Sequence, residues 1–491
     1  MRYGAAVAWK LRLFGKEQSG SFAILMAMVV AALSLSAGYA LNLAQLYNAR
    51  SGLKNALDAA VTSTARDIIS GKIAADNARD RVELFLQANG DPTFASGDKL
   101  VLDTLTIDKT KSTIKVAGHI DVDLYFPLFG LSNERRVTNV SAAVYSDKTI
   151  EVAMMLDVTR SMKKEGKVDK IGDLKLAAEN AVKAFLANQN PENPRVRVAL
   201  VPYASGVNVG ALSRNIYAEQ PRSSDLPPAA NDEVIGGKKN TTELPAFDKY
   251  VAKVATAFKP EDSCATERKD KNGKPDFSDD APDSVRLNKN GKKYYALVNR
   301  DDKLSGSGMN ECPKAKIVPL TTDQDALVDS IRDFEANGYT AGAVAIQWTY
   351  YMLSPKWRKA IKTAKLGDGP TDRDDKKISK VAILMTDGQF NTAFAGVGSD
   401  YNGQDSKTRQ NAEAICKNMK DDNIEIFTIG FDLDNKDMSK AQRDAAKGVL
   451  KKCATQDTTA IKHYFEASTG EELDNALQEI VYNTERLALT Q

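Results

Sequence analysis

The hydrophobic positions divide the chain into an apolar N-terminal segment, a short region of alternating polarity, and a long region in which apolar runs and amphipathic stretches take turns. No charged residue occurs from Ser21 to Ala49, and Phe22 to Leu41 supplies the roughly 20 apolar residues that a membrane-spanning helix needs. Residues 1–20 carry four basic side chains and one acid. Because a basic flank stays in the cytoplasm, we predict a cytoplasmic N-terminus and a single-pass anchor that places the remaining chain outside.

Helical spacing of Leu, Ala and Val continues beyond the predicted span as far as Ile69. This pattern predicts one long helix over 21–69, and two helices broken near Gly52 are the alternative. A cleaved signal peptide is the alternative to the anchor, because small residues occur around Ala40. The apolar stretch is long for a signal peptide, however, and the helical pattern runs on past it.

Residues 70–148 predict a small α+β connector. A helical stretch over Ala74–Gln87 is followed by three runs of alternating polarity, which indicate half-buried antiparallel strands. These runs are Leu100–Asp108, Ser112–Tyr125 and Arg135–Tyr145. His119 is expected to be a partly exposed strand residue without a ligand role.

From residue 149 to 491, apolar strands alternate with amphipathic helices, and this predicts an α/β domain with a doubly wound, mainly parallel sheet. The predicted strands are Ile150–Leu156, Val196–Pro202, Val381–Met385, Ile424–Ile429 and Tyr464–Ala467. The predicted helices are Lys170–Ala187, Ala341–Leu353, Arg409–Lys420 and Leu473–Leu487. An insertion over 210–317, rich in Lys, Asp, Asn, Gly and Pro, interrupts this order. Loops of that length are usually functional or disordered, and we expect this one on the side of the ligand-binding loops, where it could affect partner choice.

Composition and motifs exclude several classes of function. The 67 basic and 65 acidic residues leave a formal charge of +2, so no overall field attracts nucleic acid. Only two histidines occur, His119 and His463, which argues against a zinc enzyme with histidine ligands. The sequence contains no GxSxG, HExxH or Walker motif, and we predict that the protein is not an enzyme.

The four cysteines fall along the sequence as two pairs, Cys264 with Cys312 and Cys416 with Cys453. An even number in a chain that crosses a membrane favours disulfides in an oxidising compartment. Four buried free thiols are the alternative, since sequence alone does not fix the connectivity.

A carboxylate and two hydroxyl side chains follow the first strand of the long region. Asp157 comes directly after Ile150–Leu156, and Thr159 and Ser161 occupy alternate positions behind it. In an open α/β sheet, ligands bind in the crevice beyond the carboxyl ends of the strands. Hard oxygen ligands of this kind suit Mg²⁺, which keeps several waters and takes few protein ligands. The pattern therefore indicates a site for a small cation.

Two further loops could meet the first one. Gly338–Gly342 precedes a predicted helix, and Thr386–Gly388 follows a predicted strand. The three loops resemble the metal-ion-dependent adhesion site (MIDAS) of von Willebrand factor A domains, whose first loop reads Asp-x-Ser-x-Ser. The resemblance implies Mg²⁺, or alternatively Mn²⁺ or Ca²⁺, bound by Asp157, Thr159, Ser161, Thr340 and Asp387. It also implies that an acidic residue of a protein partner completes the coordination of the metal.

The segment Gly20–Ala65 resembles the N-terminal segment of the TadE/TadG-like proteins of bacterial Tad (Flp) pilus assembly. The likeness lies in the glycine followed by an apolar run and in the NALDAA that ends Leu53–Ala60. Some members are processed after such a glycine and carry Glu five residues later, where this chain has Leu25. TadG-like members place a von Willebrand factor A domain after the anchor, as this chain is expected to do.

Together, these resemblances imply a protein of the bacterial inner membrane with a periplasmic A domain that binds other pilus-assembly proteins. A surface adhesin that uses the same A domain on host or matrix ligands is the alternative. An A domain serving an ATP-driven chelatase would need a cytoplasmic location, which the predicted topology opposes. Cys416, with KKCAT downstream, also resembles a cysteine pair of bacterial members, which implies a disulfide that holds Tyr464–Ala467 on the sheet.

Overall fold

The structure, a computed structural model, divides into two compact units, Met1–Ser146 and Asp147–Gln491, and each is described by itself. It describes residues 20–69, 73–88, 100–108, 113–126, 134–144, 148–187, 189, 194–216, 246–247, 263–270, 274–287, 291, 293–298, 312–372, 378–397, 401–436, 438–459 and 461–490. The predicted cytoplasmic segment 1–20 lies outside these residues except for Gly20, and so does much of the insertion.

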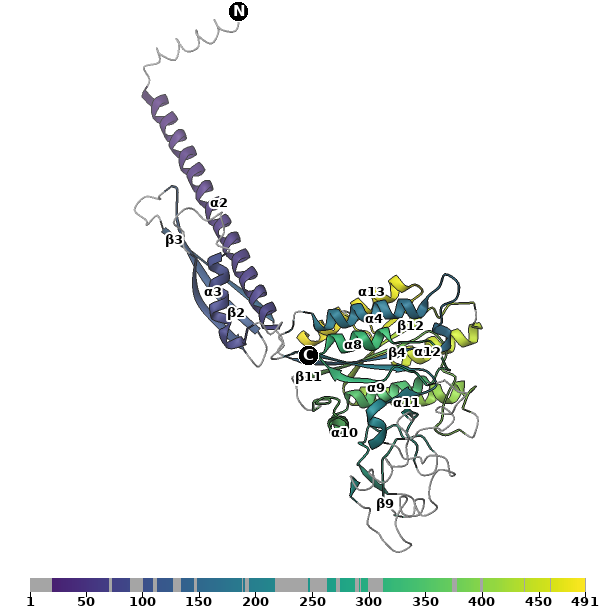
Figure 1. The fold of residues 1–491 in the computed structure, drawn as a ribbon. Coiled ribbons are helices and arrows are strands. Elements are labelled where there is room, and N and C mark those ends of the chain that lie inside the picture. Colours follow the sequence, from purple (N-terminus) through teal and green to yellow (C-terminus); the bar gives the residue numbers. More distant parts are fainter. Residues whose placement is uncertain are drawn as a thin grey trace, which may run out of the picture. The chain divides into compact units, whose positions relative to one another are not determined.

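The first unit consists of a long helix and a three-stranded sheet that packs against its C-terminal half (Figure 1). The helix α2 (Gly20–Ile69) is continuous through Gly52, so a break there does not occur. A short helix α3 (Ala78–Ala88) and the antiparallel strands β1 (Leu100–Asp108), β2 (Thr113–Asp123) and β3 (Glu134–Val144) complete the unit. Alternate residues of β2, from Ile114 to Val122, face α2 and bury their side chains against Leu53 and Leu57. His119 lies on the opposite face of β2 and is buried, not partly exposed as expected, because the Asp103 carboxylate lies 2.5 Å from its Nδ1.

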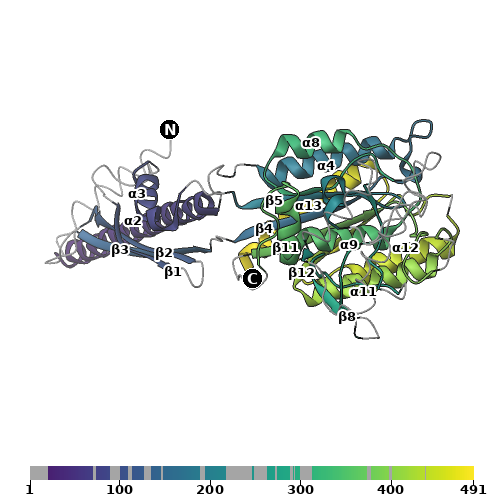
Figure 2. The ribbon, with the colours of Figure 1, turned by 60° about the horizontal axis from the view of Figure 1, so that its bottom comes forward.

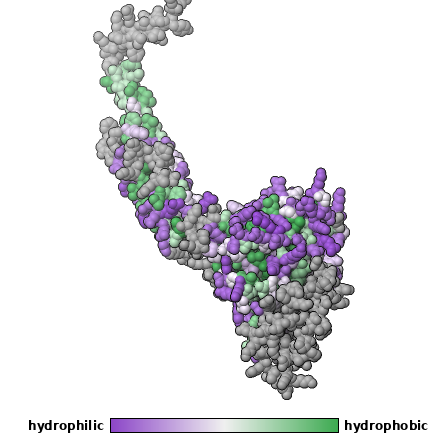
Figure 3. Space-filling model, in the orientation of Figure 1, coloured by the Kyte–Doolittle hydropathy of each residue, from purple (hydrophilic) through white to green (hydrophobic). Residues whose placement is uncertain are grey.

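Among the described residues, the N-terminal half of α2 leaves most of its apolar side chains exposed. Its residues from Phe22 to Leu43 are largely exposed, and Figure 3 shows their hydrophobic surface. By length and composition, α2 is the one helix among the described residues that could cross a membrane, although a signal sequence meets the same criterion. The exposed apolar half of α2 therefore calls for an apolar environment outside the described residues, whereas the other half is already covered by the sheet.

The second unit is a mixed α/β structure built on one large sheet. The strands run β13-β12-β11-β4-β5-β6-β7, with β10 beside β5, and the pairs from β13 to β5 are parallel. The parallel strands are β4 (Thr149–Asp157), β5 (Val196–Tyr203), β11 (Ile378–Thr386), β12 (Ile424–Phe431) and β13 (Tyr464–Ala467). The antiparallel edge consists of β6 (Val207–Asn208), β7 (Cys264–Ala265) and β10 (Val318–Thr321).

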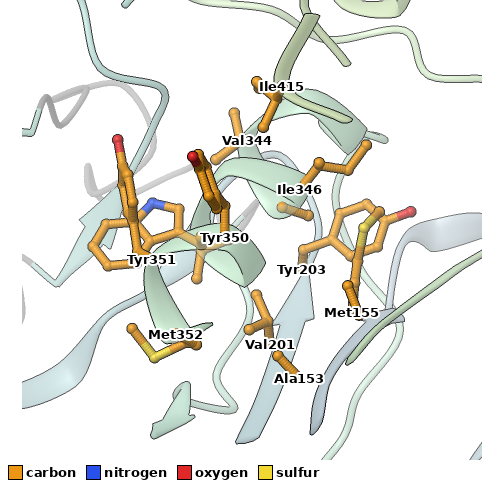
Figure 4. Close-up of a cluster of buried hydrophobic side chains, with 14 of the residues drawn as sticks. Ala153, Met155, Val201, Tyr203, Val344, Ile346, Tyr350, Tyr351, Met352 and Ile415 are labelled. Carbon is orange, nitrogen blue, oxygen red and sulfur yellow. The ribbon is translucent and has the colours of Figure 1, made fainter. Parts of the chain in front are cut away.

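Helices cover both faces of this sheet (Figures 1 and 2). One face carries α4 (Lys170–Leu186), α8 (Gln324–Arg332) and α13 (Gly470–Thr490), and the other carries α9 (Gly342–Leu353), α11 (Asp405–Asp421) and α12 (Lys440–Cys453). Because both faces are covered, β4 is buried along nearly its whole length, as continuous apolar runs in parallel sheets are. Figure 4 shows the core under α9, where Met155 and Tyr203 from the strands meet Val344 and Ile346 from the helix.

Both cysteine pairs form disulfides, Cys264–Cys312 and Cys416–Cys453. The first joins the edge strand β7 to the end of the insertion, after which the chain enters β10. The second joins α11 to the end of α12, and neither cysteine lies in β13. The expectation that this bond holds Tyr464–Ala467 on the sheet is therefore wrong in its mechanism, because β13 is held by its own parallel pairing with β12.

The described part of the insertion packs over α9 and the loop after β11. The buried Glu267 carboxylate accepts hydrogen bonds from the backbone N–H groups of Phe394 and Ala395 at 2.7 and 3.1 Å. Arg268 is also buried and lies over the Tyr351 ring of α9. These contacts make the described part of the insertion a cover for one face of the sheet.

Candidate metal centre

The first loop of the site follows β4 and turns sharply behind Asp157. The Asp157 carboxylate is buried, and its Oδ1 accepts a hydrogen bond from the Thr159 N–H at 2.9 Å. This bond bends the chain into a short 3-10 turn, Arg160–Met162, which brings Ser161 back beside Thr159. The two hydroxyl oxygens of Thr159 and Ser161 lie 2.9 Å apart. The local sequence therefore gathers one carboxylate and two hydroxyls within a few residues.

The third loop meets the first because β4 and β11 are neighbours in the sheet. The Ser161 hydroxyl donates to Asp387 Oδ1 at 2.6 Å. Asp157 Oδ2 accepts a bond from the Thr386 hydroxyl at 2.8 Å, and the Asp387 N–H lies 3.4 Å from the same oxygen. Two buried carboxylates at the ends of neighbouring parallel strands thus lie side by side, and each accepts a hydrogen bond from a hydroxyl group.

The second loop is joined to both others through its backbone. The Arg160 N–H donates to Gly338 O, and the Asn391 N–H donates to Thr340 O, both at 3.0 Å. The Asn391 side chain accepts from the Thr340 N–H at 3.0 Å in return. Next to this junction, a Cβ atom at Gly342 would lie 2.2 Å from the Phe390 ring, so only glycine permits the approach of the two loops.

A pocket of about 430 Å³ opens above this junction. Among its lining residues are Ser161, Thr340 and Asp387 of the predicted ligands, while Asp157 and Thr159 lie buried beneath and bond to that set. The structure therefore brings all five predicted ligands together. The described part of the insertion contacts the loop after β11 through Glu267, but none of its residues lines the pocket.

The charges around the pocket are predominantly negative. Lys170, the first residue of α4, places its Nζ 3.2 Å from Asp387 Oδ2 and 2.8 Å from Asp432 Oδ2. Burial and the neighbouring Asp157 carboxylate raise the pKa of Asp387, and Lys170 only partly opposes this. Burial, together with Asp157, likewise raises the pKa of Tyr203, whose hydroxyl donates to Asp157 Oδ2 at 2.8 Å. Asp387, Asp432 and the buried Asp157 outnumber Lys170, while Lys163 and Glu165 in the pocket lining offset each other, and this arrangement favours a further cation.

Sequence reasoning missed Lys170, Tyr203 and Asp432. Asp432 follows β12 as Asp387 follows β11, so the pattern of an acid behind an apolar strand could have found it. Tyr203 ends β5 directly opposite Asp157 in register, and that pairing needs the sheet order. No sequence signal marks Lys170, because its neighbourhood depends on how α4 starts relative to two distant loops.

The donor set is one of oxygens alone. Within the described residues, no group of three or more His, Cys, Asp or Glu side chains is placed to hold a metal. The predicted ligands include only two residues of these types, Asp157 and Asp387, and the other three are hydroxyl side chains. Such a set matches the ligand preference of Mg²⁺ better than that of zinc or copper. The residues present therefore fit a hard divalent cation.

No protein-family model and no curated protein matches the sequence. Solved structures that it resembles include pilus tip, minor pilin and adhesin proteins. One is the pilus adhesin SpaC from Lactobacillus rhamnosus GG, with 10% identity over 81% of this chain and 36% of that chain, at a TM-score of 0.34. Another is the vWF domain of the type V pili tip protein Mfa5 from Porphyromonas gingivalis, with 11% identity over 70% of this chain and 97% of that one, at 0.36. The PilB minor pilin from Streptococcus sanguinis matches at 10% identity over 79% of each chain, at 0.32. Likeness this remote assigns neither an activity nor a partner.

Proposed function

We propose that this protein is a membrane-anchored, TadG-like component of pilus assembly, whose second unit is a von Willebrand factor A domain that binds a protein partner through a metal ion. The observation that carries the proposal is the pair of buried carboxylates, Asp157 and Asp387, which lie beside each other and are each bonded to a hydroxyl, with Asp387 lining an open pocket. The chain order of anchor, connector and α/β unit supports the TadG-like assignment.

In the proposed site, Ser161, Thr159, Thr340 and the two aspartates would hold Mg²⁺. Tyr203 and Thr386 orient the Asp157 carboxylate by donating to its Oδ2 at 2.8 Å each. Asp157 is thereby fixed beneath the site, while Ser161 and Asp387 reach the pocket. A bound divalent ion would have its formal charge balanced by the two carboxylates, and coordination positions that protein oxygens do not fill would stay open to a further ligand.

Such a centre selects an acidic partner. Neutral hydroxyls fill positions that additional carboxylates would occupy in a fully protein-bound cation site, so the pocket retains attraction for one more carboxylate. The exposed Arg160 side chain of the first loop lies over the Tyr339 ring and adds a positive charge to this loop. The chemistry that we propose for the site is that of binding.

For localisation, we propose that α2 crosses the bacterial inner membrane once and places the second unit in the periplasm. The exposed apolar surface from Phe22 to Leu43 and the basic residues before it support this orientation. The two disulfides suit an oxidising compartment.

The test is metal-dependent capture of partners in cells that assemble the pilus. Wild-type protein and an Asp387→Asn variant would be cross-linked in the periplasm, with and without a divalent-metal chelator, and the captured proteins identified. We expect pilus-assembly proteins to be captured by the wild type in the presence of metal only. Equal capture by the variant would refute the metal-bridged contact, and capture of host or matrix proteins alone would favour the adhesin.

A further inference from the structure

Two aromatic residues, Tyr125 and Phe126, follow β2 and are fastened to α2. The Asn42 side chain donates to Phe126 O at 2.7 Å and accepts from the Phe126 N–H at 3.1 Å. One turn further along α2, Gln45 donates to Asp123 O at 2.7 Å and accepts from the Tyr125 N–H at 3.2 Å. Four hydrogen bonds therefore hold this end of the connector at a fixed height on the helix.

That height coincides with the end of the apolar span. Phe22 to Leu41 is 20 residues, which in a helix extend about 30 Å, the thickness of the bilayer's hydrocarbon core. Asn42 is the residue directly after this span. The Phe126 ring packs on Gly38, where an added Cβ would come within 3.1 Å of its Cγ. The ring therefore lies against the last turn of the span.

The aromatic side chains at this level are exposed. Tyr125 is 67% exposed, Phe126 47% and Tyr39 59%. In water, such a group of apolar side chains would be costly, whereas amphipathic rings are stable at the boundary between lipid headgroups and acyl chains.

The charged residues lie on the other side of this level. Asp123 and Glu134 end and begin the two strands of the hairpin, and Arg50 is the first charged residue after the span. The helix α3 is placed further still, since Arg81 bonds to Asp67, which is 25 residues beyond Asn42 along α2 (67 − 42). Polarity thus changes along α2 as it would across a membrane surface.

We propose that Tyr39, Tyr125 and Phe126 form an interfacial anchor, through which the connector sheet inserts one corner into the outer headgroup boundary of the bilayer that α2 spans. The partner surface is lipid, recognised by aromatic side chains in place of basic ones. The inference rests on the proposed membrane-spanning role of α2. Its consequence is that the connector is held at a fixed distance from the membrane surface and cannot swing freely on the helix.

Site-directed spin labelling of the full chain tests this anchor. All four native cysteines are in disulfides, so a single introduced cysteine is the only reactive thiol. Labels are placed by Tyr125→Cys at the anchor, Leu33→Cys inside the span, and Leu84→Cys on the exposed side of α3. The protein is reconstituted in vesicles of phosphatidylethanolamine and phosphatidylglycerol, and the collision rates of each label with oxygen and with a water-soluble nickel chelate are measured.

At position 125, we expect nickel collisions several-fold less frequent than at position 84 and oxygen collisions intermediate between positions 84 and 33. Adding Phe126→Ser to the labelled Tyr125→Cys chain should raise the nickel collision rate at position 125. If position 33 is shielded from nickel while position 125 is as accessible as position 84, α2 spans the membrane and the interfacial anchor is wrong. If position 33 is itself accessible to nickel, the membrane-spanning proposal fails and the anchor fails with it.

Discussion

The neighbouring strands β4 and β11 carry buried charged side chains at both of their ends, which pair opposite charges at one end and like charges at the other. At the amino ends, Glu151 stands opposite Lys380 in register. At the carboxyl ends, Asp157 and Asp387 bring two negative charges together. Both pairs are buried, so burial alone does not distinguish a structural pair from a binding site.

The amino-end pair is fully matched. Lys380 Nζ lies 2.5 Å from Glu151 Oε2 and also donates to Leu353 O and Thr371 O, while Arg197 and Thr371 bond to Glu151 Oε1. The carboxyl-end pair lacks such a complete set of charged partners: Lys170 contacts Asp387, and a pocket opens beside it. A buried charge with a complete set of partners stabilises the fold when the set stays intact, and an incomplete set points to a ligand.

The largest effect is expected from removing the charge of Glu151 at the amino ends of the two strands. Glu151→Gln leaves the Lys380 ammonium buried without its counter-ion, which should lower the free energy of unfolding by about 3–5 kcal/mol. Urea unfolding followed through the buried Trp348 and Trp357 reports this unit directly. The loss should be the same with and without Mg²⁺, and a metal-dependent loss would contradict the separation of the two ends.

The pH dependence of the free energy of unfolding also reports on the pair at the amino ends, Glu151 and Lys380. Burial opposes ionisation of Glu151, but Lys380, Thr371 and Arg197 outweigh it and lower its pKa below the ordinary 4.5. A lowered folded-state pKa means that the stabilisation is fully present above pH 4.5 and is lost as the pH falls through the folded value. Wild-type stability should therefore drop more steeply in that acidic range than the stability of Glu151→Gln. Parallel curves for the two proteins would contradict this assignment.

At the open end, the junction of the second and third loops depends on Gly342. Gly342→Ala forces a Cβ into the Phe390 ring, and overpacking of this kind costs about 1–3 kcal/mol. We expect weaker metal binding together with lower stability, because the clash moves the loop that carries Asp387. Phe390→Leu in the same chain should recover part of both, and no recovery would place the cause elsewhere.

A smaller effect is expected from the ammonium that occupies the open end. Lys170→Met removes a positive charge 3.2 Å from Asp387 while keeping the length of the side chain. Since coupling between contacting groups is typically about 0.5–3 kcal/mol, Mg²⁺ affinity should rise by about tenfold. Lys163→Met is the matched control, because Lys163 is exposed and lines the same pocket. An equal rise in both variants would mean that only the general field of the pocket has changed.

The elements that bury apolar runs on both faces could be predicted from the sequence. The structure has strands at Ile150–Leu156 and Val381–Met385, and each extends by one to three residues at its ends because the flanking polar residues still pair in the sheet. α8 and α12 were missed, since their polar faces dominate short segments and their apolar residues pack only in the folded unit. The MIDAS and von Willebrand factor A assignments stay predictions.

The candidate site, too, could be predicted from the sequence only in part. The order of strands and acids along the sequence suggested which loops could meet, because parallel strands bring their carboxyl ends to one edge. The contacts that set its charge could not be predicted. Lys170 reaches Asp387 and Asp432 from a helix start far from both in sequence, and only packing of α4 on the sheet brings them together.

Calorimetric titration of the full chain with Mg²⁺ and Mn²⁺ tests the proposed metal site directly. It compares the wild type with the Asp387→Asn and Glu165→Gln variants. Asp387→Asn keeps the shape of the ligand and removes its charge, while Glu165 is an acid that lines the same pocket without belonging to the predicted ligands. We expect binding by the wild type and by Glu165→Gln, and none by Asp387→Asn. Absence of binding by the wild type at millimolar metal, or undiminished binding by Asp387→Asn, would contradict the proposed site.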